Sequence, residues 1–171
     1  KIQGRGVLTR PLGKQQYPLV ILVSGSGSQD FDVTIADHKY FAVIADSLTR
    51  AGIAVFRFDD RGVGGAGGNA LETTSSIIAE DVMAARNMIK NKFPDITKFG
   101  VLGHSQGGNA AVKLAADKAN QLDFVIFLAA PGQLGRDLIV EQVVNIDAAN
   151  HIAKEETLAK IEDDYQSIES V

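Results

Sequence analysis

The stretch Gly103-His104-Ser105-Gln106-Gly107 decides the fold of this chain. It is a G-x-S-x-G sequence that follows a short apolar run at 99–102 and opens a stretch of small residues at 105–119. A reactive serine in this pattern stands on a sharp strand-to-helix turn, where its backbone is strained and its hydroxyl is exposed. A side chain at either flanking position would clash, and both positions are glycine. We therefore predict that Ser105 is a nucleophile with a positive φ angle.

The alternative is a purely structural role, in which Ser105 is only a turn or N-cap serine. A capping serine needs no glycine on both sides, so the nucleophile interpretation is favoured. Gly108 follows the motif and would let the new helix pack closely on neighbouring strands.

Two backbone N–H groups are predicted to bind an oxyanion. A helix that begins after Ser105 would present the N–H of Gln106 to the developing charge. The loop at 24–28, all serine and glycine, follows an apolar run at 18–23, and we predict the second donor from Ser26. A phosphate-binding loop is the alternative here. The loop lacks the G-x-x-x-x-G-K-[ST] spacing, and Asp30 stands where G-x-G-x-x-G requires glycine.

Apolar runs and amphipathic stretches alternate along the chain, which predicts an α/β fold. Strands are expected at 6–9, 18–23, 53–58, 99–102 and 124–129, and helices at 38–50, with Gly52 as its C-cap, at 73–92 and at 105–119. This alternation indicates a mainly parallel sheet with helices on both faces.

The pattern changes after residue 133. Apolar residues recur at helical spacing among polar and acidic ones, with no strand candidate: Leu138, Val140, Val143, Val144, Ile146, Leu158, Ile161, Tyr165 and Ile168. We predict a core domain over 1–133 and a segment of two amphipathic helices over 134–171. An apolar stripe of this size would pack against a partner, either further sequence or a second copy of the chain.

The glycine-rich sequence at 59–64, Asp-Asp-Arg-Gly-Val-Gly, follows the predicted strand at 53–58. It lies where ligands approach open α/β sheets, so one interpretation is a wall of the active site. The other is a turn tied by an Arg–Asp pair that holds the loop under Ser105. We favour the structural interpretation.

Composition restricts the function classes. Of 171 residues, 45% are hydrophobic and 22% charged, the values of a globular domain. The net charge of −4 argues against a nucleic-acid partner, and the absence of cysteine excludes disulfides and thiolate metal sites. No apolar run is long enough to cross a bilayer. The chain begins at Lys1 rather than Met, and we expect that a signal peptide or other segment precedes it.

Five stretches carry a family resemblance: S-G-S-G-S-Q-D (24–30), D-H-K-Y-F-A-V-I-A-D-S-L (37–48), F-R-F-D-D-R-G-V-G (56–64), G-H-S-Q-G-G (103–108) and L-A-A-P-G (128–132). Together they resemble the bacterial α/β-hydrolases related to the serine aminopeptidase and dienelactone hydrolase groups. The resemblance runs from Gly6 to Gly132. It implies a Ser-His-Asp triad with Ser105 as nucleophile, and a helical cap inserted near residue 134. The family often has His-Gly where this chain has Ser24-Gly25.

The triad histidine and acid are not evident in the sequence. In this fold both follow the serine, on loops after further strands. His38 precedes Ser105, and His104 is the variable position of the motif. His151 has the right order, with Asp137 or Asp147 as its acid, but it lies between two helical stretches. We therefore expect a fragment cut within the cap, with the missing half, or a second copy, packing on the cap helices.

These patterns lead to an expected mechanism. The resemblance favours hydrolysis of a carboxylic ester through an acyl-Ser105 intermediate, without metal or organic cofactor. The partners expected are a small-molecule ester or a short peptide, and neither nucleic acid nor membrane. A serine peptidase using the same site is the first alternative. A non-catalytic binding protein is the second, although such proteins usually lose the nucleophile.

Overall fold

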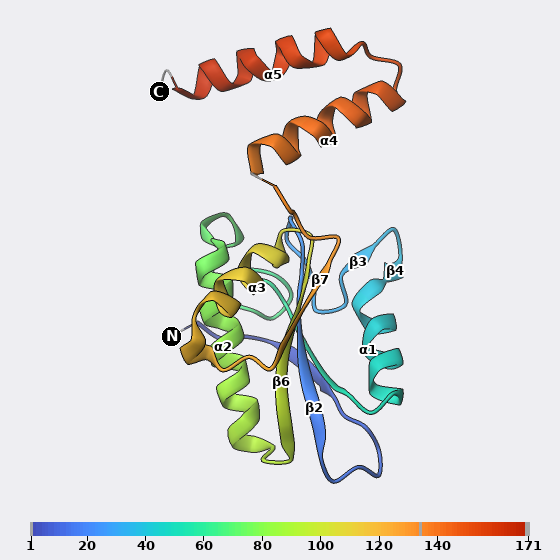
Figure 1. Cartoon of the computed structure of the whole chain (residues 1–171), viewed down its shortest axis with the longest axis vertical. Helices are drawn as coiled ribbons and strands as arrows, with labels where there is room; N and C mark the ends of the chain where they lie inside the picture. The colour runs from blue at the N-terminus through green and yellow to red at the C-terminus, as the bar shows by residue number, and fades with distance from the viewer. Residues whose placement is uncertain (1, 134, 170–171) are drawn as a thin grey trace. The chain divides into compact units, whose positions relative to one another are not determined.

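The computed structural model describes residues 2–133 and 135–169, with side chains up to residue 163 (Figure 1). The chain divides into two compact units, Lys1–Ala130 and Pro131–Val171. The first unit contains the sheet and the serine motif, and the second contains helices. Each unit is described by itself.

The first unit is built on a five-stranded sheet in the order β1-β5-β2-β6-β7. The strands span Gly6–Thr9 (β1), Tyr17–Val23 (β2), Ala54–Phe58 (β5), Ile96–His104 (β6) and Phe124–Leu128 (β7). β5, β2, β6 and β7 are parallel neighbours, and β1 pairs antiparallel with β5. The predicted parallel sheet is therefore confirmed. Parallel strands end at one edge of a sheet, so the loops after β2, β5, β6 and β7 meet there.

Strand β2 lies in the centre of the sheet and is buried on both faces. Leu19, Ile21 and Val23 belong to a core cluster on one face, and Val20 and Leu22 belong to the cluster on the other. This alternation follows from the two-residue period of a strand. Full burial of each such aliphatic side chain contributes roughly 1.5–3 kcal/mol, which explains why the run carries no polar residue.

Helices cover both faces of the sheet, as predicted. Helices α2 (Ser75–Lys92) and α3 (Gly107–Ala116) pack on one face, and α1 (Tyr40–Arg50) covers the other (Figure 1). The hydroxyl of Thr74 caps α2 by accepting the N–H of Ile77 at 3.3 Å. Gly52, with φ +95°, follows the C-cap of α1 in the left-handed conformation that favours glycine.

Some predicted bounds were wrong. Helix α1 begins at Tyr40 rather than residue 38, because Thr34–Ile35 (β3) and His38–Lys39 (β4) form a two-stranded hairpin before it. Helix α3 begins at Gly107 and ends at Ala116, and a short 3₁₀ turn, Lys118–Asn120, follows it. Strand β6 is longer than the predicted strand at 99–102. Its start was missed because its first residues are largely exposed and show no apolar periodicity. A second 3₁₀ turn spans Ala70–Glu72.

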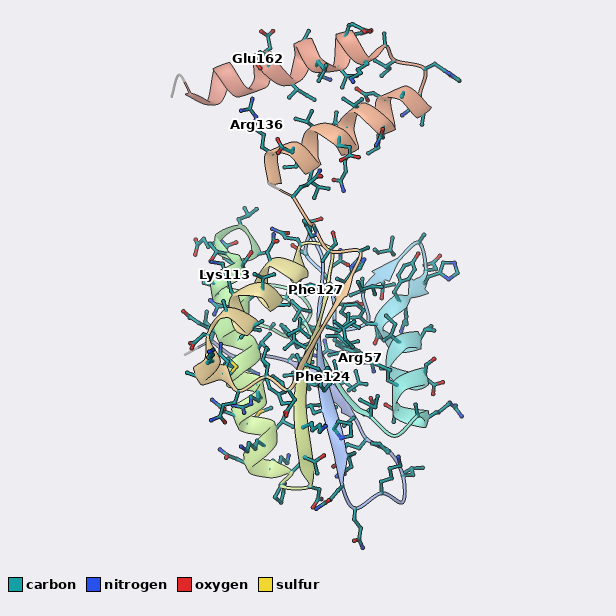
Figure 2. The ribbon with its side chains drawn as sticks, viewed as in Figure 1. Arg57, Lys113, Phe124, Phe127, Arg136 and Glu162 are labelled. Atoms are coloured by element: carbon teal, nitrogen blue, oxygen red, sulfur yellow. The ribbon has the colours of Figure 1, made fainter. Side chains whose placement is uncertain are left out.

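The outer strand β7 exposes apolar side chains. Phe127 is 53% exposed, and Ile126 and Leu128 beside it are exposed as well. Figure 2 shows Phe124 and Phe127 toward opposite ends of this strand. An exposed apolar edge strand is typical of a surface that another polypeptide segment covers.

The second unit is a hairpin of two helices, α4 (Gly135–Ala149) and α5 (Lys154–Glu169) (Figure 1). The predicted helical tail is thus confirmed over these ranges. The two helices are joined by the buried Thr157, whose hydroxyl donates to the carboxylate of Asp147 at 2.8 Å. The side chains of Tyr165 and Ile168 lie outside the described residues. The cap role of this unit stays a prediction. Within the described ranges, no helix combines the length and apolar character needed to span a membrane.

Candidate active site

Ser105 stands on the turn between β6 and α3, with φ +50°. The predicted positive φ is confirmed. A non-glycine residue in this left-handed region is strained, and such strain is characteristic of functional turns. The N–H of Ser105 donates to the carbonyl of Leu128 at 3.0 Å, and its own carbonyl accepts the N–H of Gly108 at 2.9 Å. The turn is therefore tied both to the end of β7 and to the first turn of α3.

The glycines around Ser105 are required by close backbone packing. A Cβ atom at Gly103 would lie 2.6 Å from the carbonyl oxygen of Gly107. A Cβ at Gly107 would collide with the carbonyl oxygens of Val23 and Ser24 at the end of β2, and one at Gly108 would collide with Ala130. Glycine is therefore required on both sides of the serine for steric reasons.

The backbone N–H of Gln106, whose role as an oxyanion donor stays a prediction, lies at the start of α3. Gln106 is the N-cap of α3, with helical φ and ψ of −56° and −28°. In the described part of the chain its N–H makes no hydrogen bond to another protein group. A free N–H at a helix N-terminus, next to the serine, is available to a negative oxygen.

The loop of small residues after β2 lies against the serine. A Cβ at Gly25 would come 3.0 Å from the Cβ of Ser105, so the backbone approaches the serine as closely as glycine allows. Gly25 and Gln106 also line a cavity of about 320 Å³ together with Ser24, Gly27 and Ser28. Ser26 is not among the residues that line it, and its carbonyl accepts a weak hydrogen bond from Gln29 at 3.4 Å. The donor role of Ser26 stays a prediction.

The aspartates that follow β5 fix the neighbouring loops. The Asp60 carboxylate accepts the Ser24 hydroxyl at 2.7 Å and the N–H of Gln29 at 2.9 Å. Asp59 accepts the N–H of Phe31 at 2.8 Å and lies 3.4 Å from the Arg5 guanidinium. Burial raises the pKa of Asp60, against the effect of its two hydrogen bonds, and the nearby charge of Asp59 raises it further.

Arg61 is tied away from this loop. Its guanidinium binds both carboxylate oxygens of Asp81 on α2, each at 2.7 Å. Asp60 and Arg61 also line the cavity beside Gln106. Arg61 is thus paired with an aspartate, as the structural interpretation predicted, and the active-site interpretation of the 59–64 sequence stays a prediction. The tie itself differs from the local pair that we expected, because Arg61 reaches to a helix.

A buried charge network supports the same end of the sheet. The side chains of Arg57 and Asp32 form a buried ion pair, which Lys39 joins at 3.6 Å from Asp32. Arg57 lies on β5 in the interior of the unit (Figure 2). No sequence pattern predicted this ion pair, because its partners are 25 residues apart.

The three histidines do not complete a triad in the first unit. His104 packs edge-on against the Phe41 ring at 6.4 Å, and its Nδ1 is buried without a hydrogen-bond partner in the described chain. His38 lies in β4 and contacts the ring of Tyr40. His151 belongs to the second unit, in the turn after α4, with φ +65°. Among the described residues, no set of three His, Asp or Glu side chains is grouped to bind a metal ion.

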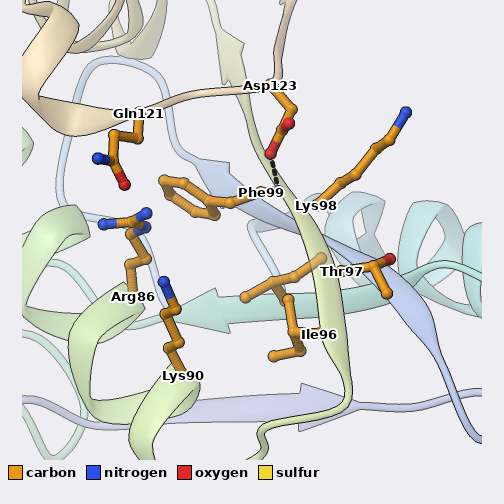
Figure 3. A pocket seen from close by; sticks show the side chains of 9 residues that line it. Arg86, Lys90, Ile96, Thr97, Lys98, Phe99, Gln121 and Asp123 are labelled. Carbon is orange, nitrogen blue, oxygen red and sulfur yellow. Dashed lines mark hydrogen bonds between the residues drawn. The ribbon is translucent and has the colours of Figure 1, made fainter.

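A second hollow, of about 240 Å³, lies at the opposite end of β6 (Figure 3). There the Arg86 guanidinium lies over the Phe99 ring at 5.0 Å, and the Asp123 carboxylate accepts the N–H of Phe99 at 2.7 Å. Phe99 is six residues before Ser105, which corresponds to roughly 20 Å along a strand. This hollow is therefore separate from the serine site.

Comparison with known proteins agrees with this architecture. Residues 34–161 match the family described as serine aminopeptidase, S33. The esterase EstD of Thermotoga maritima is 30% identical over 158 residues, which cover 92% of this chain and 38% of EstD. The chain therefore spans well under half the length of that relative.

Solved structures share the fold. A thermostable carboxyl esterase from Bacillus coagulans superposes with a TM-score of 0.62 at 18% identity, covering 88% of this chain and 51% of that one. Est1E from Butyrivibrio proteoclasticus, solved with ferulic acid, has a TM-score of 0.59 at 22% identity, covering 72% and 47%. Because the family match extends over most of the sheet and the serine turn, the chain belongs to the serine aminopeptidase S33 family of α/β-hydrolases.

Proposed function

We propose that the protein carrying this chain is a serine hydrolase that cleaves a carboxylic ester through an acyl-Ser105 intermediate. The observation that carries the proposal is the left-handed Ser105, at φ +50° between β6 and α3, flanked by glycines that close packing requires. This arrangement holds the hydroxyl of a half-buried serine at the tip of a rigid turn. The name of the relative EstD favours an ester as substrate.

The proposed reaction has two steps. The Ser105 oxygen attacks the ester carbonyl while a histidine takes its proton, and the alcohol leaves with that proton. Water then attacks the acyl-serine and releases the carboxylic acid. We propose that N–H groups of Gln106 and of the 24–28 loop stabilise the negative oxygen in both steps. The histidine and its orienting acid are assigned to sequence beyond this chain.

A peptidase is the second candidate, because the matching family is described as serine aminopeptidase. The same serine, base and oxyanion donors cleave an amide bond. The two candidates differ in the leaving group, so they are separated by substrate rather than by a residue of the turn.

The test uses the full-length protein with p-nitrophenyl acetate and with aminoacyl p-nitroanilides. We expect ester hydrolysis that Ser105→Ala lowers by several powers of ten, about 10³-fold or more. Ser47→Ala is the matched control, because Ser47 is exposed on α1, away from the serine turn. Faster turnover of the anilide would favour the peptidase. An unchanged ester rate in Ser105→Ala would reject the proposed function.

A further inference from the structure

We infer that Asp60 is a positioning residue, which holds the 24–28 loop at the distance from Ser105 that oxyanion binding needs. The inference rests on the proposed function, since it concerns the donors of the same site. It adds a residue that neither the G-x-S-x-G motif nor the expected triad contains.

The Asp60 carboxylate accepts hydrogen bonds from both ends of the loop. One oxygen accepts the Ser24 hydroxyl at 2.7 Å and the other accepts the N–H of Gln29 at 2.9 Å. The N–H of Asp60 in turn donates to the carbonyl of Gln29 at 3.0 Å. One residue therefore binds both ends of the loop, at Ser24 and at Gln29.

The part of the loop between those ends lies against Ser105. Gly25 approaches Ser105 so closely that a Cβ would come within 3.0 Å of the serine Cβ. Among the described residues, the N–H of Ser26 makes no hydrogen bond to protein, and its carbonyl accepts only the weak bond from the Gln29 side chain at 3.4 Å. Positions 24–28 hold only serine and glycine, and the two glycines give the backbone of the loop conformational freedom. The position of the loop therefore depends on the bonds at its two ends.

Asp60 itself is held in place by a strand of the sheet. It follows β5, which pairs with β2 in parallel register, so it is carried by a rigid strand next to the one that precedes the loop. Oxyanion donors act only at hydrogen-bond distance from the reacting oxygen, and a displacement of about 1 Å costs as much as 10²-fold in rate. Losing the clasp should therefore lower kcat more than it raises KM.

Two variants separate hydrogen bonding from charge. Asp60→Leu keeps much of the volume and removes both acceptors. Asp60→Asn keeps a clasp, because its amide oxygen accepts the Gln29 N–H while its NH₂ donates to the Ser24 hydroxyl. We expect Asp60→Leu to lower kcat by about tenfold or more with KM changed by less than about threefold, and Asp60→Asn to stay within about threefold of the parent in both.

Asp123→Leu is the matched control. Asp123 also accepts a backbone N–H, that of Phe99 at 2.7 Å, but at the far end of β6. We expect it to lower the thermal midpoint and leave kcat unchanged. If Asp60→Leu does not fold, Ser24→Ala removes one end of the clasp alone and should lower kcat by about threefold or more.

All variants are measured in the full-length protein with p-nitrophenyl acetate. Parental kcat in a folded Asp60→Leu would overturn the inference, as would equal losses in Asp60→Leu and Asp60→Asn, or a kcat loss in Asp123→Leu as large as in Asp60→Leu. In each of these cases the parent protein still shows an ester activity that depends on Ser105. Failure of the proposed function is distinguished by the absence of such activity.

Discussion

Gly25 lies directly against Ser105: a Cβ atom at Gly25 would be 3.0 Å from the serine Cβ and 3.2 Å from Nδ1 of His104. The register of the sheet explains the contact, because Val23 of β2 pairs with Gly103 of β6. Two residues further along the chain from this pair lie Gly25 and Ser105. The loop after one strand and the nucleophile after the next are therefore neighbours through strand pairing.

Gly25→Ala is expected to impair the reaction more than the fold. The added methyl must displace either the loop or Ser105 by a few tenths of an ångström, because the Cβ of Ser105 is fixed by the backbone of its turn. We expect kcat to fall by about tenfold or more, while overpacking lowers the unfolding free energy by about 1–3 kcal/mol. Steady-state kinetics and urea unfolding of the full-length protein measure the two effects.

Gly4→Ala is the control for this variant, because a Cβ at Gly4 would have no atom within 4 Å. Its kinetics should match the parent. A Gly25→Ala protein with parental kcat and KM would mean that the loop tolerates displacement, which contradicts the proposed role of its backbone in catalysis.

The sheet and the serine turn could be predicted because their signals are local. A short, fully apolar run such as 18–23 is typical of a strand buried on both faces. The glycines around Ser105 are needed because a Cβ atom there would clash with backbone close by. Even the φ angle of Ser105 follows from the pattern. A serine on such a strand-to-helix turn is expected to act as a nucleophile.

The rest of the site could not be predicted, because it depends on contacts between distant residues. Ser24 and Asp60 are 36 residues apart, and no spacing rule links a serine in one loop to an aspartate in another. The β3–β4 hairpin was missed for a different reason. Its strands have two residues each, and its turn places Ala36 and Asp37 at positive φ, a conformation that alanine does not signal and that aspartate adopts more often than most residues.

Asp60→Asn should change how stability depends on pH. Burial, with the like charge of Asp59, raises the pKa of Asp60 in the folded protein above its ordinary 3.8. The folded state then holds the proton more tightly than the unfolded state, so this carboxyl makes the unfolding free energy fall as pH rises from about 3.8 through the raised pKa. Asparagine has no proton to lose, and that decline disappears.

The measurement is urea unfolding of both proteins from about pH 4 to about pH 7. We expect the variant to gain stability relative to the parent as pH rises, and the difference to level off once Asp60 is ionised in both states. Arg61 and Asp81 line the same cavity, but they are bound to each other in both proteins and cancel in the difference. A difference that does not change with pH, or that falls, contradicts a raised pKa.

The last prediction concerns the 171-residue chain by itself. A serine hydroxyl is a weak nucleophile until a base takes its proton, and in the first unit neither His38 nor His104 is hydrogen-bonded to Ser105. The base and its orienting acid together raise the rate by several powers of ten. Without them, only the residual catalysis from the oxyanion donors and substrate binding remains. We therefore expect this chain to react slowly with a fluorophosphonate probe, and the full-length protein to react rapidly and only at Ser105.

Both lengths are labelled side by side, with full-length Ser105→Ala as the blank. Rapid labelling of the short chain at Ser105 would contradict the prediction, because it would require a base among the residues present. His151 would then be the first residue to replace, since it alone of the three histidines follows the serine in sequence. His151→Ala would abolish that labelling if it is the base. If labelling persisted, the base would be a residue other than His151, and His38 and His104 would be replaced next.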